Sequence, residues 1–328
     1  MRVLVTGASG LLGGEVARQL LRHGHDVATF QRRPSGVEGV QDFRGAINDD
    51  AALRPAIEGA EGIVHLAAKV SVTGPEAEFV AVNVEGTRRL LHMAAAAGVR
   101  DVVFVSSPSV AHSGTAIMGS GADKADPRQA RGAYARTKAA AELLALEADR
   151  PGFRVAAVRP HIVWGPGDTQ LVERVLDRAG SGRLPLLDSG AALIDTTYLD
   201  NAASAIVAAL HRMEHIHGGA VVVSNGEPRP IGELLAGICA AGGVAPPSWS
   251  VPGGLARAAG ALVEKFWTWS GRREEPPMTR FLAEQLSTAH WFDQRLTREL
   301  LDWTPAVSLD EGLARLAAYY GSRASENG

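Results

Sequence analysis

The first 23 residues constrain the fold of this chain more than any other stretch. Residues 1–6 form a short apolar run typical of a buried strand, and a glycine-rich turn leads from it into a helical stretch over 14–23. Such a turn binds anions, because backbone N–H groups and the positive end of the helix dipole face one point. Gly7 permits the tight turn, Gly10 lets the backbone approach a phosphate, and Gly13 lets the helix pack on the strand. A loop of ordinary turn residues is the alternative, but a strand and a helix flank this one, which favours a doubly wound parallel α/β (Rossmann) sheet holding a dinucleotide.

Length, composition and charge narrow the class of protein. The 328 residues suffice for one large α/β unit and a smaller partner. The net charge is −3 and no basic cluster is interleaved with aromatic residues, so we expect no nucleic-acid partner. No apolar run reaches the roughly 18 residues of a membrane span, and the N-terminus begins in the first strand without a signal peptide.

The cysteine content indicates the compartment. Cys239 is the only cysteine, so an intrachain disulfide is excluded and a reducing, cytoplasmic setting is expected. It lies in an apolar stretch over 234–240, which favours a small core residue over a nucleophile.

A tyrosine and a lysine four residues apart supply the candidate chemistry. Tyr134 and Lys138 lie in a predicted helix over 132–149, so both side chains project from one face. Ser107 ends an apolar strand that starts at 101. A phenol beside an ammonium, with a hydroxyl from another element, can move a proton to or from an oxygen. Such pairs also occur by chance on helix surfaces; this one follows a strand that ends in serine.

The glycine turn, T-G-x-x-G-x-x-G over 6–13, resembles that of the extended short-chain dehydrogenase/reductase family. Two further stretches also resemble motifs of that family: H-x-A-A over 65–68 and R-P-x-x-V-W-G-P-G over 159–167. The resemblance implies a fold that binds a nicotinamide dinucleotide. The cofactor-binding residues that it implies are Gly7, Ser9, Gly10, Leu11, Leu12, Gly13, Leu66, Ala67, Ala68, Ser106, Tyr134, Lys138, Pro160 and Ile162.

The same resemblance implies the catalytic roles of Ser107, Tyr134 and Lys138. Family members carry the active serine or threonine three residues before a valine, the position of Val110, which selects Ser107. Strand alternation separately indicates that Ser106 and Ser107 do not share one role. Tyr134 would transfer the proton, and Lys138 would lower the pKa of the phenol and hold the nicotinamide ribose.

The residues after the second strand bear on the cofactor. Arg32 and Arg33 stand where an NAD enzyme usually has an acid for the ribose 2′-hydroxyl. Guanidinium groups suit a 2′-phosphate, so NADP(H) is preferred, with NAD(H) as the alternative. Ala46 replaces the acid that the family usually places near the adenine, while Ile47 is expected to flank the ring.

Several other residues receive structural interpretations. His65 is expected to be a satisfied core histidine and Asn83 a structural support. His161 is a weak candidate for substrate contact. Histidines 211, 215 and 217 lack further residues at ligand spacing, so no metal is expected.

The resemblance implies two units. Residues 1–160 and 196–224 would form the NADP-binding Rossmann unit, and 161–195 with 225–328 a smaller α+β C-terminal substrate-binding unit. The tail resembles the branch containing the 3β-hydroxysteroid dehydrogenases, and FLAEQLSTAHWFD over 281–293 resembles the bacterial 2-alkyl-3-oxoalkanoate reductases of olefin biosynthesis. This implies a hydrophobic ketone or secondary alcohol as substrate. An NAD-dependent nucleotide-sugar epimerase or dehydratase, and a non-catalytic NADP-binding sensor, are the alternatives.

Three segments lead to further expectations. Residues 114–131 are expected to form an irregular loop over the site. The apolar run over 255–269 is open to three interpretations, a lid, a membrane-surface helix and core, of which core is preferred. The helices over 84–97 and 132–149 are those that the family usually pairs in a homodimer.

Overall fold

A parallel sheet of seven strands organises the first unit of the computed structural model, which describes residues 1–71, 74–112, 114–270 and 280–326. Its order is β3-β2-β1-β4-β5-β7-β12, and every neighbouring pair is parallel. The predicted doubly wound sheet is therefore confirmed. The strands are β1 (Arg2–Thr6), β2 (Asp26–Gln31), β3 (Gln41–Arg44), β4 (Gly62–His65), β5 (Asp101–Val105), β7 (Arg154–Pro160) and β12 (Ala220–Val223).

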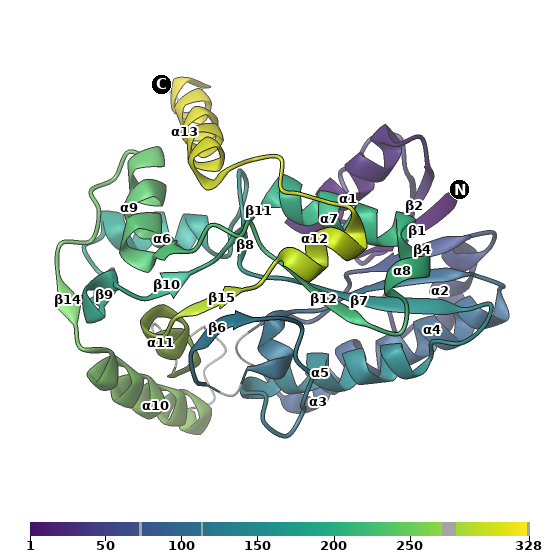
Figure 1. Ribbon diagram of the computed structural model, residues 1–328, viewed down its shortest axis with the longest axis horizontal. Helices are drawn as coiled ribbons and strands as arrows, with labels where there is room; N and C mark the ends of the chain where they lie inside the picture. Colours follow the sequence, from purple (N-terminus) through teal and green to yellow (C-terminus); the bar gives the residue numbers. More distant parts are fainter. Residues whose placement is uncertain (72–73, 113, 271–279, 327–328) are drawn as a thin grey trace.

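Helices cover both faces of this sheet (Figure 1). One layer consists of α1 (Leu11–Arg22), α7 (Leu199–His211), α8 (Met213–Ile216) and α12 (Arg295–Leu301). The other consists of α2 (Asp50–Ile57), α3 (Glu76–Phe79), the π-helix η1 (Val80–Glu85), α4 (Gly86–Ala96) and α5 (Gly132–Glu147). Strand order reverses between β1 and β4, the point at which doubly wound sheets open a crevice for a ligand.

The second unit is built on a four-stranded sheet of order β13-β10-β15-β6. Its strands are β6 (Ile117–Ser120), β10 (Leu193–Ile194), β13 (Arg229–Pro230) and β15 (His290–Phe292). Two-stranded pairs join β8 (Val163–Trp164) to β11 (Thr197–Tyr198) and β9 (Leu186–Leu187) to β14 (Ser250–Val251). The helices are α6 (Val172–Gly180), α9 (Ile231–Ala241), α10 (Gly253–Ser270), α11 (Arg280–Ser287) and α13 (Leu309–Glu326). Cys239 is fully buried in the core of this unit, as predicted.

The expectation of an irregular loop over 114–131 is wrong in part. Residues Ile117–Ser120 form β6, which pairs in parallel with β15. The partner strand lies far along the chain, so no local pattern indicated this pairing.

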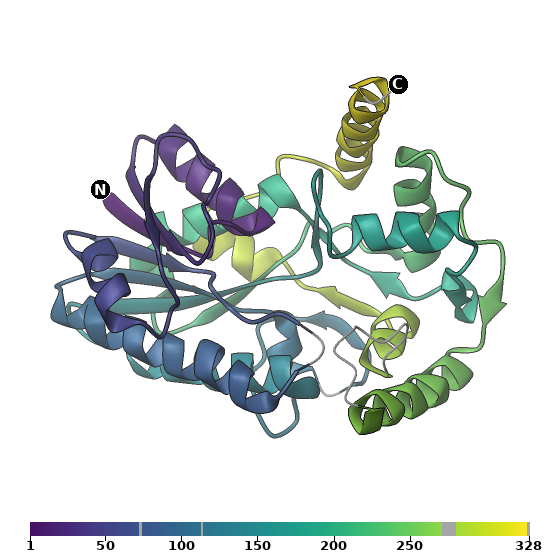
Figure 2. The same ribbon diagram turned by 180° about the vertical axis from the view of Figure 1, so that it is seen from behind.

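The preferred interpretation of residues 255–269 as core is wrong where the side chains are described. Leu255 and Leu262 are 64% and 68% exposed, while Ala256 packs inward in a small cluster. Residues 264–270 belong to α10, but their side chains lie outside the described part. The helix lies at the far edge of the smaller unit (Figure 2). No helix among the described residues is long and apolar enough to cross a membrane.

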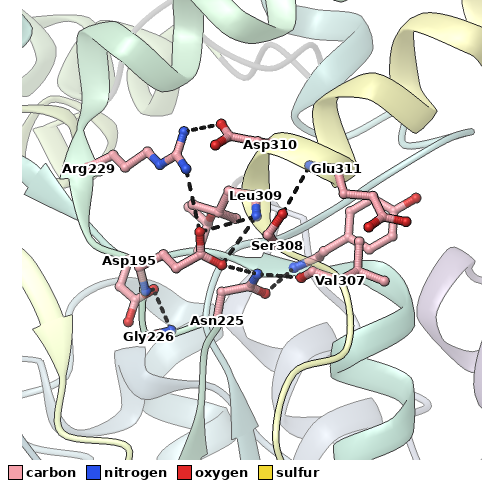
Figure 3. Close-up of polar contacts among 12 residues, drawn as sticks. Asp195, Asn225, Gly226, Arg229, Val307, Ser308, Leu309, Asp310 and Glu311 are labelled. Carbon is pink, nitrogen blue, oxygen red and sulfur yellow. Dashed lines mark hydrogen bonds and ion pairs between the residues drawn. The ribbon is translucent and has the colours of Figure 1, made fainter.

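A cluster of hydrogen bonds and ion pairs joins the segments where the chain passes between the two units (Figure 3). Asn225 Nδ2 donates to Val307 O at 2.9 Å, and Arg229 pairs with Asp310 at 2.5 Å. Asp195 is fully buried and accepts from Ser224 Oγ at 2.5 Å and Gly226 N at 3.1 Å. Burial raises the pKa of Asp195 to about 6.

Candidate active site

The glycine turn packs too closely to admit side chains. Gly7 has φ +80°, and a Cβ there would lie 2.9 Å from the backbone nitrogen of Ala67. A Cβ on Gly13 would overlap the carbonyl oxygen of Gly7. Gly10 is exposed, and a Cβ there would lie 3.4 Å from Gly7 O. The geometry matches the roles predicted for Gly7 and Gly13, while the approach of Gly10 to a phosphate stays a prediction.

The first turn of α1 offers free backbone donors. The helix begins at Leu11 with Gly10 as N-cap and no side-chain cap hydrogen bond. The N–H groups of Leu11, Leu12 and Gly13 have no intrahelical acceptor, as in any first helical turn. With the partly accessible Ser9, they form a cradle that suits a diphosphate.

The loop after β4 forms the other side of the crevice. Leu66 N donates to Thr6 O at 3.2 Å and Ala67 N to Thr6 Oγ1 at 3.1 Å, while Ala68 continues the partly accessible edge. His65 is buried between Thr6 Oγ1 at 2.7 Å and Thr87 Oγ1 at 3.0 Å. Burial lowers the pKa of His65 to about 3, so it is the satisfied core histidine that was predicted.

The end of β2 presents two exposed guanidiniums. Neither Arg32 nor Arg33 donates a side-chain hydrogen bond to any described residue. An acid missed in the sequence does lie nearby: Asp42 of β3 accepts from Thr29 Oγ1 at 2.7 Å and from Gln31 Nε2. Ala46 provides no carboxylate at the position where the family usually has one near the adenine. Ile47 is 7% exposed in the core beside Gly86, and its contact with an adenine stays a prediction.

Ser107 and Tyr134 come from separate elements and lie within range of each other. Ser107 is the N-cap of the 3₁₀ turn η2 (Pro108–Ala111), and its hydroxyl accepts from Ser109 N at 3.3 Å. Burial raises the pKa of Tyr134 to about 12, and a hydrogen bond with Ser107 opposes this rise. Ser106 differs: its hydroxyl is buried and has no hydrogen-bond partner among the described residues.

Lys138 lies deeper than the resemblance implied. Its Nζ donates to Val105 O at 2.6 Å and lies 4.0 Å from the ring centroid of Phe104. Burial lowers its pKa to about 7, and the charge of Glu142 opposes the shift. In this structure burial outweighs the lowering effect of Ser107, so the phenol pKa of Tyr134 lies above its ordinary value.

Asn83 supports the helix that carries this pair. Its Oδ1 accepts from Lys69 N at 2.7 Å, and its Nδ2 donates to Thr137 Oγ1 at 3.0 Å. Thr137 was missed in the sequence, although it stands between Tyr134 and Lys138. Its hydroxyl donates to Ala133 O at 2.7 Å, so the predicted support acts on the first turn of α5.

The turn after β7 is strained at its second position. Pro160 ends the strand, and Ile162 follows with φ +40°, a left-handed conformation that is costly for a β-branched residue. His161 Nδ1 donates to Asp195 O at 2.5 Å. Trp164 is fully buried with its Nε1 donating to Thr196 Oγ1, so it is a core residue.

A seam between the two units joins His161, the weak candidate for substrate contact, to polar groups that sequence reasoning missed. Arg131, the N-cap of α5, pairs with Glu284 of α11. His112, which follows η2, is 3% exposed, and its Nε2 has no hydrogen-bond partner among the described residues. His161 stacks edge-to-face on His290 with ring centroids 4.9 Å apart. A sequence signal existed only for Arg131, one helical turn before Tyr134.

A cavity of about 220 Å³ opens beside the segment that follows Ser107. Its apolar walls include Ile117 and Phe292. Its polar walls are supplied by Thr115, Ser120, Asp123 and Arg159. Arg159 is neutralised by its buried ion pair with Glu142 at 2.5 Å.

The histidines near the end of α7 find other partners. His211 Nε2 lies 2.8 Å from His25 Nε2, and His217 Nδ1 lies 3.0 Å from Asp149. Within the described ranges, no group of three or more histidine, cysteine or acidic residues is placed to hold a metal ion.

Comparison with known proteins gives the family. The model of the NAD dependent epimerase/dehydratase family matches residues 3–224. The chain is 39% identical over 326 residues to the 2-alkyl-3-oxoalkanoate reductase of Stenotrophomonas maltophilia, covering 97% of this chain and 99% of that protein. It is 35% identical to the enzyme of the same name from Shewanella oneidensis, covering 96% and 85%.

A solved structure adds the bound ligands of one neighbour. MoeE5 in complex with UDP-glucose and NAD is 25% identical with a TM-score of 0.74, covering 99% of this chain and all of that one. The match of the family model over most of the chain and the identity to named reductases agree with the glycine cradle and the serine–tyrosine pair. The chain therefore belongs to the NAD dependent epimerase/dehydratase family, as an oxidoreductase of the extended short-chain dehydrogenase/reductase type that depends on a nicotinamide dinucleotide.

Proposed function

We propose that this protein is an NADPH-dependent reductase of a hydrophobic 3-oxo acid, a 2-alkyl-3-oxoalkanoate. The observation that carries the proposal is that Ser107 lies close enough to Tyr134 to oppose the rise that burial causes in the pKa of its phenol. Both groups lie at the carboxyl end of β5, on the same edge of the sheet as the glycine cradle. The two similar proteins named for this reaction support the substrate class.

When bound, the nicotinamide supplies the hydride in reduction and, once oxidised, a positive charge near the phenol. Ser107 would hold the substrate oxygen by its hydroxyl and orient the carbonyl carbon. Tyr134 would give its proton to that oxygen as negative charge develops there. The same groups would take the proton back in alcohol oxidation, so cofactor supply decides the direction.

The pKa of Lys138 is about 7, so near neutrality this side chain can both take up and release a proton. It therefore suits a role in returning the proton to Tyr134. Its Nζ uses one N–H on Val105 O, and the others remain for the nicotinamide ribose. In this proposal the charge of the oxidised cofactor, together with a protonated Lys138, lowers a phenol pKa that burial alone raises.

The preference for NADPH rests on Arg32 and Arg33. Both guanidiniums are exposed at the end of β2, and a 2′-phosphate offers the geometry that such groups bind bidentately. Asp42 argues for the alternative, NAD, but its carboxylate already accepts from Thr29 and Gln31. We therefore keep NADPH as the preferred cofactor.

The competing functions differ in what the substrate site must contain. A 3β-hydroxysteroid needs an apolar site and no charge. A nucleotide sugar, the ligand named for MoeE5, needs polar and basic groups for a diphosphate. The cavity beside the segment after Ser107 has apolar and polar walls, so the choice of a hydrophobic oxo acid rests on the two similar reductases. A non-catalytic NADP-binding sensor would not require the serine–tyrosine pair.

Oxidation of NADPH tests the proposal with three substrates: a 2-alkyl-3-oxo acid, a 3-ketosteroid and a UDP-sugar. We expect turnover with the oxo acid and no comparable rate with the other two. Activity on the UDP-sugar alone would overturn the proposal, and NADPH binding without turnover of any substrate would favour the sensor.

The partner of the chain is a separate proposal. We propose a homodimer formed through α4 and α5, which lie side by side on one face of the sheet (Figure 1). Sedimentation at micromolar concentration would test it, and a monomer under those conditions would refute it.

A further inference from the structure

The polar groups at the seam are placed by the same elements that carry the reactive pair. Arg131 is the N-cap of α5, one helical turn before Tyr134. His112 follows η2, whose N-cap is Ser107. Val110 of η2 packs with Ala135 and Ala139 of α5, which joins the two elements. The two elements that carry the hydroxyl and the phenol therefore also carry a guanidinium and an imidazole.

Arg131 is held in place but keeps free donors. Its Nη1 donates to Glu284, whose side chain is only 4% exposed, while the Arg131 side chain remains 36% exposed. Its guanidinium lies against Gly114, where φ is +92° and a Cβ would overlap it. Its Nε and Nη2 donate to no other described residue, so two N–H edges face outward from an oriented group.

His112 provides a second unused polar atom. The Nε2 of this buried ring has no hydrogen-bond partner among the described residues, and a buried polar atom of this kind is destabilising unless a ligand or water satisfies it. Burial lowers the pKa of the His112 ring, while the charge of Glu284 raises it and that of Arg131 lowers it, so the ring lies within range of both charges.

We propose that Arg131 and His112 bind the carboxylate of the substrate while Ser107 and Tyr134 hold its 3-oxygen. This inference rests on the proposed function and names the residues that would select an acid over an uncharged ketone. In a 3-oxo acid a single carbon separates the two oxygen functions, so adjacent binding groups are what the molecule requires. A planar guanidinium is the side chain best suited to a carboxylate, and Glu284 fixes its orientation in advance.

The oxidative direction gives the sharpest experiment, because a 2-alkyl-3-hydroxy acid and its methyl ester differ only in the charge to be recognised. NADP⁺ reduction by the full chain is measured with both substrates. We expect Arg131→Gln to lower kcat/KM for the acid by about 10- to 100-fold, as for loss of a charged hydrogen bond, and to leave the ester within about threefold. His112→Gln should show the same selectivity with a smaller loss.

Two further variants keep the test decisive. Arg128→Gln removes an exposed arginine from the same loop and should leave both substrates unchanged. Arg131→Gln combined with Glu284→Gln removes both charges, avoids a stranded carboxylate and should reproduce the selective loss for the acid.

An equal loss for acid and ester in the Arg131 variants, or no loss for either, would overturn the inference while leaving the reductase intact. Wild-type protein that binds NADP⁺ and oxidises neither substrate would instead refute the proposed function.

Discussion

The two walls of the site are built in different ways. The first wall consists of Gly7, Gly13, Ser107, Tyr134 and Lys138, each at the end of a strand or the start of a helix of one sheet. The second wall consists of Arg131, His112, His161, His290 and Glu284, drawn from segments as far apart as η2 and α11. In the proposed function, hydride and proton transfer fall to local motifs and substrate recognition to long-range contacts. Changes in the first wall should affect every substrate alike.

The largest effect is expected for Tyr134→Phe. Without a proton donor at the reacting oxygen, kcat should fall by about 10³-fold or more for acid and ester alike, while NADPH binding persists. Steady-state kinetics and a fluorescence titration of NADPH check both statements. A loss of kcat confined to the acid would contradict the assignment of proton transfer to the first wall and of substrate recognition to the second.

Lys138→Met should increase stability, because burial of this ammonium is costly. The pKa of Lys138 falls from 10.5 in the unfolded chain to about 7 in the native one, so between these values the unfolded chain holds the extra proton. Stability of the wild type therefore rises with pH across this window, and the full cost is present below pH 7. The variant should gain about 2–5 kcal/mol at pH 7 and little above pH 10.5.

Urea unfolding of both proteins at neutral and alkaline pH measures this difference. A gain that does not depend on pH would mean that the lysine is charged in the native state throughout.

Gly13→Ala should damage the cradle. The new Cβ would overlap the backbone oxygen of Gly7, which cannot move aside as a flexible side chain would. We expect a loss of about 1–3 kcal/mol in unfolding free energy and weaker binding of either cofactor. Gly321→Ala is the control: this glycine of α13 has open space around it, and alanine there should stabilise the helix.

The smallest effect is expected for Arg32→Ala combined with Arg33→Ala. NADPH affinity should fall by about tenfold and NADH affinity by less than about threefold, because the 2′-phosphate alone loses its partners. Arg88→Ala, on the outer side of α4, should change neither. Equal losses for the two cofactors would remove the argument for NADPH.

Most of the first wall was predictable from sequence because its motifs are contiguous. The glycine turn, Ser107, His65 and Asn83 all lie as expected. The second wall was not predictable: β6 pairs with β15 across most of the chain, and Glu284 reaches Arg131 from α11. The exposure of Leu255 and Leu262 was not predicted, because an apolar run does not indicate which of its faces other elements cover. The pKa of Tyr134 differed from expectation because burial outweighs the hydrogen bond with Ser107.

The path of the C-terminal segment has a consequence for how the molecule can be divided. After β15 completes the smaller sheet, α12 returns to the large one, and Leu301 and Trp303 enter its core beside Val103 and Val221. The segment after Trp303 then returns to the smaller unit, because Leu309 and Leu316 lie in the core of that unit. No single cut yields two complete cores. Truncation at residue 225 would expose the interior of the sheet that holds the glycine turn, and the two units should melt in a single cooperative transition.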